Sequence, residues 1–516
     1  MTHLPAVPII VPALAAALLL ILHRAPIVMK RAIGIGATVT FGIAVLAIFA
    51  EARSGAPLVY RLGNWPSPFG IVLVADRLSA FMLLLTASLA LAVLLYAVQG
   101  WDARGKLFHP LFLFQVMGLN GAFLTGDLFN LFVFFEILLI ASYGLAMEGL
   151  EVERLRATLH YAAINIAASS IFLIAVSLLY GVTGTLNMAH LAERVAEVRA
   201  EDVGLVRAGG LLLLGVFAVK AAVFPLYFWL PAAYSHALAP VAALFAIMTK
   251  VGVYAIIRVT TLIFTGGEDA VMELTAPWLL PVALTTLTLG TLGALGAQRL
   301  ATMTAYLTIA SVGMILTGVA TGGSKGLAAA LYYLAHSTLV IAVLFLVGDL
   351  LRRGRGATGD QLHPGPPLRH AAPLGLAFLF AGSTVAGIPP SSGFLGKLII
   401  LQSTMNGLSV VLIWTVILVT SVLTLAACSR AGSIVLWNYV EPDQPTHDRP
   451  PRTGEWIALA GLAGCSMGLV IFAAPVTQYA DEVGTQLTSR ESYIEAVLGS
   501  GSGDFVRPYA KGKVTP

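Results

Sequence analysis

The chain has 516 residues, of which 58% are hydrophobic and only 11% are charged, and its formal net charge is +4. Soluble domains contain about 25% charged residues, so this composition excludes an ordinary soluble protein and predicts one embedded in a membrane. The basic residues form no cluster interleaved with aromatic side chains, which excludes a nucleic-acid-binding surface.

Fourteen stretches of the chain have the apolar character of membrane-spanning helices, which need about 20 residues each. They are continuously apolar, whereas the strands of a membrane barrel alternate, so we expect an all-α polytopic membrane protein. The predicted spans cover residues 5–22, 32–50, 78–98, 108–125, 128–147, 157–180, 207–224, 240–262, 275–297, 300–321, 325–350, 372–404, 408–438 and 455–475.

Three segments outside these spans have their own patterns. Residues 54–70 are rich in proline, glycine and asparagine and predict a turn-rich outer loop or hairpin. Residues 186–205 place charged residues between small apolar ones, which favours an amphipathic surface helix. After Thr477 the chain is polar and then rich in glycine, and we expect a surface helix followed by disorder.

Two segments, residues 219–231 and 386–397, are interrupted by prolines, namely Pro225 and Pro231 in the first and Pro389 and Pro390 in the second. Proline removes a backbone donor, and inside a membrane the freed groups must be satisfied by protein or water. The two interrupted helices lie five helices apart, a spacing typical of transporters built from inverted repeats.

The orientation follows from the even number of predicted spans and from the loop charges. An even number puts both termini on one side of the membrane. More lysine and arginine residues fall on the inner side when the termini are outside. We therefore expect both termini outside.

Three ionisable residues lie near the middle of predicted spans. Glu136 follows Asp127 by nine residues, roughly 13 Å along a helix, and has wholly apolar neighbours. Lys220 and Lys250 lie similarly deep, and burial disfavours the charged ammonium, so both could release and retake a proton. The alternatives are a structural ion pair for Glu136 and lysines that extend to the membrane surface.

Four further residues are candidates for proton transfer or its support. His336 lies mid-helix, where histidine can relay protons, although a lone buried histidine is more often a hydrogen-bonded core residue. Lys397 follows the second proline break. His236, in the loop after the first break, could serve proton access or only stabilise the loop, and Asp76 could simply cap a helix.

The sequence predicts no cofactor and no metal. Gly396 and Lys397 resemble the end of a phosphate-binding loop, but Leu398 stands where Ser or Thr is needed. The two cysteines, Cys428 and Cys465, have neither CxxC spacing nor nearby histidines.

Several segments around these residues resemble motifs of the antiporter-like subunit family. This family includes the proton-pumping membrane subunits of respiratory complex I and the large subunits of Mrp-type Na⁺/H⁺ antiporters. The resemblance extends over roughly residues 70–430 and is strongest to the D-type Mrp subunits. The motifs are Gly126–Glu136 (GDLFNLFVFFE), Lys220–Pro225 (KAAVFP), Leu230–His236 (LPAAYSH), Lys250–Tyr254 (KVGVY) and Ala386–Lys397 (AGIPPSSGFLGK).

The resemblance implies a fold of fourteen helices in which helices 4–8 and 9–13 form inverted repeats, with helices 7 and 12 broken. It implies four parts of the chain: residues 1–106 with helices 1–3 and the outer loop, 107–264 with the first repeat, 265–438 with the second, and 439–516 with helix 14 and a polar tail.

The resemblance also implies roles for the buried residues. Glu136 would pair with Lys220, and a hydrated axis would continue through Lys250 to Lys397. His336 occupies the position of a relay residue on the eleventh helix. Some relatives have histidine on the eighth helix and glutamate on the twelfth, whereas this chain has lysine at both.

The sequence therefore predicts a proton-translocating subunit of a multi-subunit Na⁺/H⁺ antiporter in the bacterial inner membrane, with other Mrp subunits as partners. A first alternative is a proton-pumping subunit of complex I or of a membrane-bound hydrogenase, where the chain would belong to a translocase. A second is an assembly scaffold in which the buried charges are only structural pairs.

Overall fold

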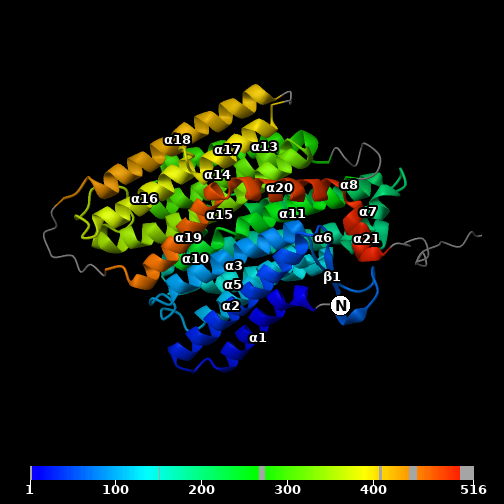
Figure 1. Cartoon of the computed structure of the whole chain (residues 1–516), viewed down its shortest axis with the longest axis horizontal. Helices are drawn as coiled ribbons and strands as arrows, with labels where there is room; N and C mark the ends of the chain where they lie inside the picture. The colour runs from blue at the N-terminus through cyan, green and yellow to red at the C-terminus, as the bar shows by residue number, and fades with distance from the viewer. Residues whose placement is uncertain (1–2, 150, 266–273, 406–408, 441–449, 500–516) are drawn as a thin grey trace, which may run out of the picture.

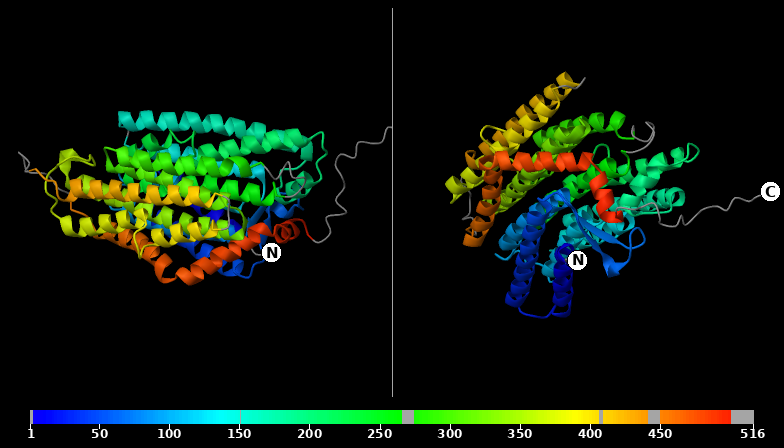
Figure 2. Two further views of the ribbon diagram at one scale, coloured as in Figure 1. Left: turned by 90° about the horizontal axis from the view of Figure 1, so that it is seen from above. Right: turned by 45° about the vertical axis from the view of Figure 1, so that its right-hand side comes forward.

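The computed structural model describes five stretches of the chain, residues 3–149, 151–265, 274–405, 409–440 and 450–499. In these stretches, twelve helices are long and apolar enough to cross a membrane, and two shorter helices are also apolar. Most of the long helices run side by side, with α1 and α2 at one edge of the bundle and α18 at the opposite edge (Figures 1 and 2). The chain is therefore a helical, multi-pass membrane protein.

The first half of the chain contains a small hairpin among its helices. Its elements are η1 (Leu4–Ala6), α1 (Val7–Ile21), α2 (Ile27–Ala52), β1 (Leu58–Arg61), η2 (Leu62–Asn64), β2 (Val72–Ala75), α3 (Arg77–Ala97), α4 (Phe108–Leu124), α5 (Leu128–Met147), α6 (Val152–Thr183), α7 (Met188–Ala196), α8 (Val203–Ala221), α9 (Leu230–His236), α10 (Ala239–Phe245) and α11 (Met248–Leu262).

The second half is helical throughout the described residues. Its elements are α13 (Ala276–Gly296), α14 (Leu300–Ala320), α15 (Gly323–Gly354), η3 (Gly356–Thr358), α16 (Ala371–Ala386), α17 (Ser392–Ser403), α18 (Val410–Leu436), α19 (Thr453–Ile471), α20 (Ala473–Thr488) and α21 (Glu491–Leu498).

Each predicted span coincides with one helix or with one interrupted pair of helices. The predicted span over 240–262 corresponds to α10 and α11, which together form one apolar stretch long enough to cross a membrane, with a short interruption at 246–247. The interruption falls less than one turn before Lys250, and both of its residues keep right-handed helical dihedral angles. The number of fourteen spans, the inverted repeats and the division into four parts stay predictions.

The outer loop and the amphipathic helix were predicted correctly in kind. The loop forms a hairpin in which β1 and β2 pair antiparallel, with Leu58 opposite Ala75 and Arg61 opposite Val72. The second strand lies after the predicted 54–70, and its four residues are all buried. Helix α7 is shorter than predicted: it begins at Met188 and is capped by Asn187, whose side chain accepts hydrogen bonds from the Ala189 and His190 amides.

The C-terminal tail begins with a helix, as predicted, and one face of this helix remains exposed. Helix α20 packs along α15 and carries one buried face, and Tyr479 Oη donates a hydrogen bond of 2.9 Å to the Arg77 carbonyl. The buried positions recur with helical spacing and are Tyr479, Ala480, Val483, Gly484 and Leu487. The glycine-rich end that we expected to be disordered lies outside the described residues.

Candidate functional site

The first proline break separates α8 from α9 and leaves backbone groups that α8 itself cannot satisfy. Other side chains supply the missing partners: Trp229 Nε1 donates to the Val219 carbonyl at 3.0 Å, and Thr286 Oγ1 accepts from the Phe224 amide at 3.0 Å. The break is therefore satisfied by protein groups, as a membrane interior requires. Lys220 lies in the last turn of α8, directly before the break.

At the second break, between α16 and α17, the candidate lysine itself bonds a backbone carbonyl group that the helix leaves free. Lys397 Nζ donates to the Ala386 carbonyl at 2.6 Å, at the C-terminal end of α16. A helix C-terminus carries partial negative charge and attracts a cation. On the other side of the break, Ser391 caps α17 by accepting a hydrogen bond from the Phe394 amide.

Glu136 and Lys220 are connected through a serine hydroxyl. Ser169, on α6, donates a short hydrogen bond to Glu136 Oε1, and Lys220 Nζ donates to Ser169 Oγ at 3.3 Å. Lys220 Nζ also donates to the Asn165 carbonyl at 3.3 Å. No ion pair joins Glu136 directly to Lys220 among the residues that the structure describes, so the geometry differs from the direct pair implied by the resemblance.

Lys250 is fully buried on α11 and contacts a second serine. Its Nζ donates to Ser311 Oγ on α14 at 3.0 Å. Helix α11 lies close to α8 here, because a Cβ on Gly252 would come within 2.9 Å of the Lys220 carbonyl carbon. A side chain at that position would push apart the helices that carry the two lysines.

His336 and Lys397 continue the pattern in the second half. His336 Nδ1 lies 2.9 Å from Ser392 Oγ, and that hydroxyl lies 3.0 Å from Ser466 Oγ on α19. Lys397 Nζ donates to Ser421 Oγ on α18 at 3.0 Å. Both basic side chains are buried.

The five residues predicted for proton transfer thus lie on a series of helices in which each helix contacts the next. Helix α5 packs on α6, α6 on α8, α8 on α11, α11 on α14, α14 on α15, α15 on α17 and α17 on α18. Each of the five side chains is hydrogen-bonded to a serine on a neighbouring helix. The sequence did not indicate these serines, since hydroxyl residues are frequent in the spans and only the fold selects the ones that face a charge.

His236 lies at a cavity of about 100 Å³ at the end of α9. Its Nε2 is 3.7 Å from a carboxylate oxygen of Glu153, and Arg154 Nε donates to its backbone carbonyl at 2.8 Å. The cavity is lined by residues of both halves of the chain, including Asp349 and Arg352. The cavity lies where His236 was predicted either to serve proton access or to stabilise the loop, and that role stays a prediction.

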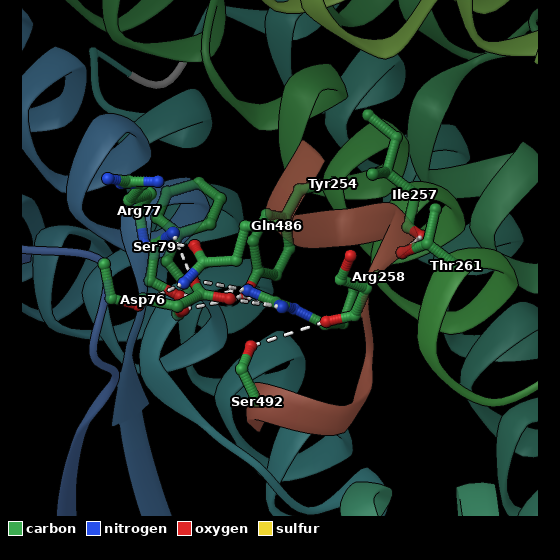
Figure 3. A network of polar contacts seen from close by, with 12 residues as sticks. Asp76, Arg77, Ser79, Tyr254, Ile257, Arg258, Thr261, Gln486 and Ser492 are labelled. Atoms are coloured by element: carbon green, nitrogen blue, oxygen red, sulfur yellow. Dashed lines mark hydrogen bonds and ion pairs between the residues drawn. The ribbon is translucent and has the colours of Figure 1, made fainter. Parts of the chain in front are cut away.

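Asp76 lies apart from the five residues predicted for proton transfer. It belongs to a network at the end of α11 opposite Lys250 (Figure 3). It caps α3 by accepting a hydrogen bond from the Ser79 amide, and it receives two hydrogen bonds from Arg258, at 2.6 and 2.8 Å. Burial alone would raise the pKa of Asp76, but the Arg258 charge and these hydrogen bonds outweigh burial and lower it. Arg258 also lies against the rings of Tyr254 and Tyr493, so this cluster connects α3, α11 and α21.

Glu148, directly after α5, is a buried carboxyl group that the sequence analysis missed. One of its oxygens is buried without a hydrogen-bond partner in the described structure, and its carboxyl group lies where a Cβ on Gly105 would stand. Burial, together with the nearby charge of Asp102, raises the pKa of Glu148 to about 7. The folded protein therefore keeps this carboxyl group protonated below about pH 7.

This raised pKa predicts a pH-dependent effect of Glu148→Gln on stability. A carboxyl group with a raised folded-state pKa stabilises the fold fully below its unfolded-state pKa of about 4.3. That contribution is lost as the pH rises through about 7. The variant should therefore raise the melting temperature of the purified protein at pH 8 and leave it unchanged at pH 4. An equal change at both pH values would contradict the burial argument.

Within the described residues, no cluster of three or more His, Cys, Asp or Glu side chains is arranged to hold a metal ion. The five residues predicted for proton transfer supply carboxyl, ammonium and imidazole groups, and each is hydrogen-bonded to a serine hydroxyl. All four can give or accept protons.

Comparisons with known proteins place this chain among antiporter subunits. The chain is 38% identical to the D-type subunit of a probable K⁺/H⁺ antiporter from Rhizobium meliloti (strain 1021), with 96% of this chain and 98% of the relative covered. It is 35% identical to the D-type subunit of a Na⁺/H⁺ antiporter from Alkalihalophilus pseudofirmus, with 96% and 100% covered. A chain in the structure of the Mrp complex from Dietzia sp. DQ12-45-1b superposes with a TM-score of 0.87 at 29% identity, covering 97% of this chain and 100% of that one.

The family assignment rests on the central part of the chain as well as on these full-length relatives. Residues 125–424 match the family described as "NADH:quinone oxidoreductase/Mrp antiporter, TM". This segment contains Glu136, Lys220, Lys250, His336 and Lys397. The chain therefore belongs to the NADH:quinone oxidoreductase/Mrp antiporter transmembrane family.

Proposed function

We propose that this chain is the proton-translocating subunit of a multi-subunit monovalent cation/proton antiporter. The observation that carries the proposal is full-length similarity to two relatives named as D-type antiporter subunits. One relative is named for K⁺ and the other for Na⁺. We retain Na⁺ as the first candidate cation and treat K⁺ as the alternative.

The five residues predicted for proton transfer support a proton path through this subunit. Protons would move between Glu136, Lys220, Lys250, His336 and Lys397, whose helices pack in sequence. His236 and its cavity would provide access from the inner side, and Asp76 would support the outer end of the bundle. Inward proton flow would drive cation extrusion, and the chain would act as part of a secondary transporter, not as an enzyme.

The proposed setting is the cytoplasmic membrane of a bacterium, with both termini outside. Other Mrp subunits would be its partners, because a chain that supplies only the proton path needs a cation path nearby. The four-part division of the chain and its inverted repeats belong to the same proposal.

The test is purification of the intact complex from its native membrane, followed by partner identification by mass and exchange assays in vesicles. We expect Mrp-type partners and a proton movement that starts when Na⁺ or K⁺ is added. Flavin- and iron–sulfur-containing partners would instead favour a role in complex I or a hydrogenase. An assembled complex without any cation-dependent proton movement would favour the scaffold.

A further inference from the structure

Ser169 has hydrogen bonds that distinguish it from the serines beside Lys250 and Lys397. Its hydroxyl accepts from Lys220 Nζ and donates to Glu136 Oε1. The hydroxyls of Ser311 and Ser421 also accept from a lysine. However, they donate to backbone carbonyls of their own helices, each at 2.6 Å.

This difference determines what each hydroxyl can do with a proton. A backbone carbonyl cannot take the proton of a serine and keep it at ordinary pH, so Ser311 and Ser421 can only hold their lysines. A carboxylate can take it. Ser169 therefore has a proton donor on one side and a titratable acceptor on the other.

We propose that Ser169 is the relay through which a proton passes between Lys220 and Glu136. In the transfer, a proton leaves Lys220 Nζ and binds Ser169 Oγ while the original hydroxyl proton moves to Glu136 Oε1. Lys220 becomes a neutral amine, Glu136 becomes a neutral carboxylic acid, and Ser169 keeps one proton. This inference rests on the proposed function and adds a residue to its proton path.

The surroundings of Ser169 favour transfer through its hydroxyl over other routes. Its side chain and that of Lys220 are both buried. No direct ion pair links Lys220 to Glu136 among the described residues. The transfer turns the Lys220 ammonium and the partly buried Glu136 carboxylate into two neutral groups. Lys220 is then able to accept the next proton.

The test compares Ser169→Ala with Ser170→Ala in vesicles that hold the assembled complex. Ser170 is the exposed neighbour on α6, and its hydroxyl donates to its own helix at the Ile166 carbonyl. We expect Ser169→Ala to slow cation-dependent proton movement about tenfold or more, since a positioned proton-transfer group contributes at least that much. Ser170→Ala should leave the rate unchanged.

A second variant keeps the test informative if the alanine variant fails to assemble. Ser169→Cys keeps nearly the same size, but a thiol is a weak donor and acceptor, so this variant should also be slow. A wild-type rate in either assembled variant, with Lys220→Ala inactive, would overturn the relay and leave the proposed function standing. Normal rates in Lys220→Ala and Glu136→Ala would overturn the proposed function itself.

Discussion

Replacing Lys220 with alanine is expected to abolish cation-dependent proton movement, with a loss of about a hundredfold or more. Lys220 is the basic group that donates to Ser169, which in turn donates to Glu136. Without it, the carboxyl group has no exchangeable donor on the path toward Lys250. Glu136→Ala should have the same effect from the other end. The measurement is fluorescence of a pH-sensitive dye trapped in vesicles that contain the complex.

Lys325→Ala is the matched control, because this lysine is exposed near the start of α15 and away from the line. It should keep the wild-type rate. Normal exchange in Lys220→Ala and Glu136→Ala would refute the path. Failure of both variants to assemble, with Lys325→Ala intact, would instead favour the scaffold, in which the buried charges only hold helices together.

Arg258→Ala is expected to destabilise the protein by about 3–5 kcal/mol, the usual effect of removing one partner from a buried ion pair. The substitution leaves the Asp76 carboxylate buried without its charged partner, and both side chains are almost fully buried. It also removes the contact of the guanidinium with Tyr493. The expected outcome is a large fall in the melting temperature and in the amount of assembled complex.

A double variant separates the ion pair from the other contacts of Arg258. Asp76→Ala together with Arg258→Ala leaves no unpaired charge, so it should be less destabilising than the sum of the single variants. Arg258→Lys keeps the charge but cannot donate two parallel hydrogen bonds, and it should be intermediate. Melting temperatures of the purified variants supply the measurement, and strict additivity would contradict a coupled pair.

The sequence predicted the helices well because a membrane imposes a simple rule on it. Long apolar runs must become helices there, and every predicted span coincides with a helix or an interrupted pair. The prolines indicated two of the interruptions, because proline removes a backbone donor from a helix. The third interruption, between α10 and α11, has no proline at 246–247 and was not visible in the apolar pattern.

The buried charges could also be found from the sequence, whereas their partners could not. Glu136 and Lys250 stand out because charges are rare inside apolar spans. Ser169 and Ser311 do not stand out, because serine can satisfy its hydroxyl on its own helix and therefore occurs throughout such spans. Only the packing of α6 beside α8 and of α14 beside α11 brings these two hydroxyls to the lysines.

Charges near the ends of helices were also missed, since they look like ordinary loop residues. Glu148 follows α5 by one position, and nothing in the sequence indicates that the loop with Gly105 covers it. The partner of Asp76 is more than a hundred residues away, on another helix. The polar tail was predicted to form a surface helix, but its composition does not reveal that the buried face of this helix packs on α15.

The central claim is that one line of buried groups carries protons through the bundle, and Lys250 lies in its middle. The most direct measurement is therefore the proton movement of Lys250→Ala in vesicles, started by added Na⁺ or K⁺, with assembly checked on the same sample. We predict a clearly slower rate in a fully assembled complex, because the first half of the line is then cut from His336 and Lys397. An unchanged rate would make Lys250 a structural residue and contradict a continuous path.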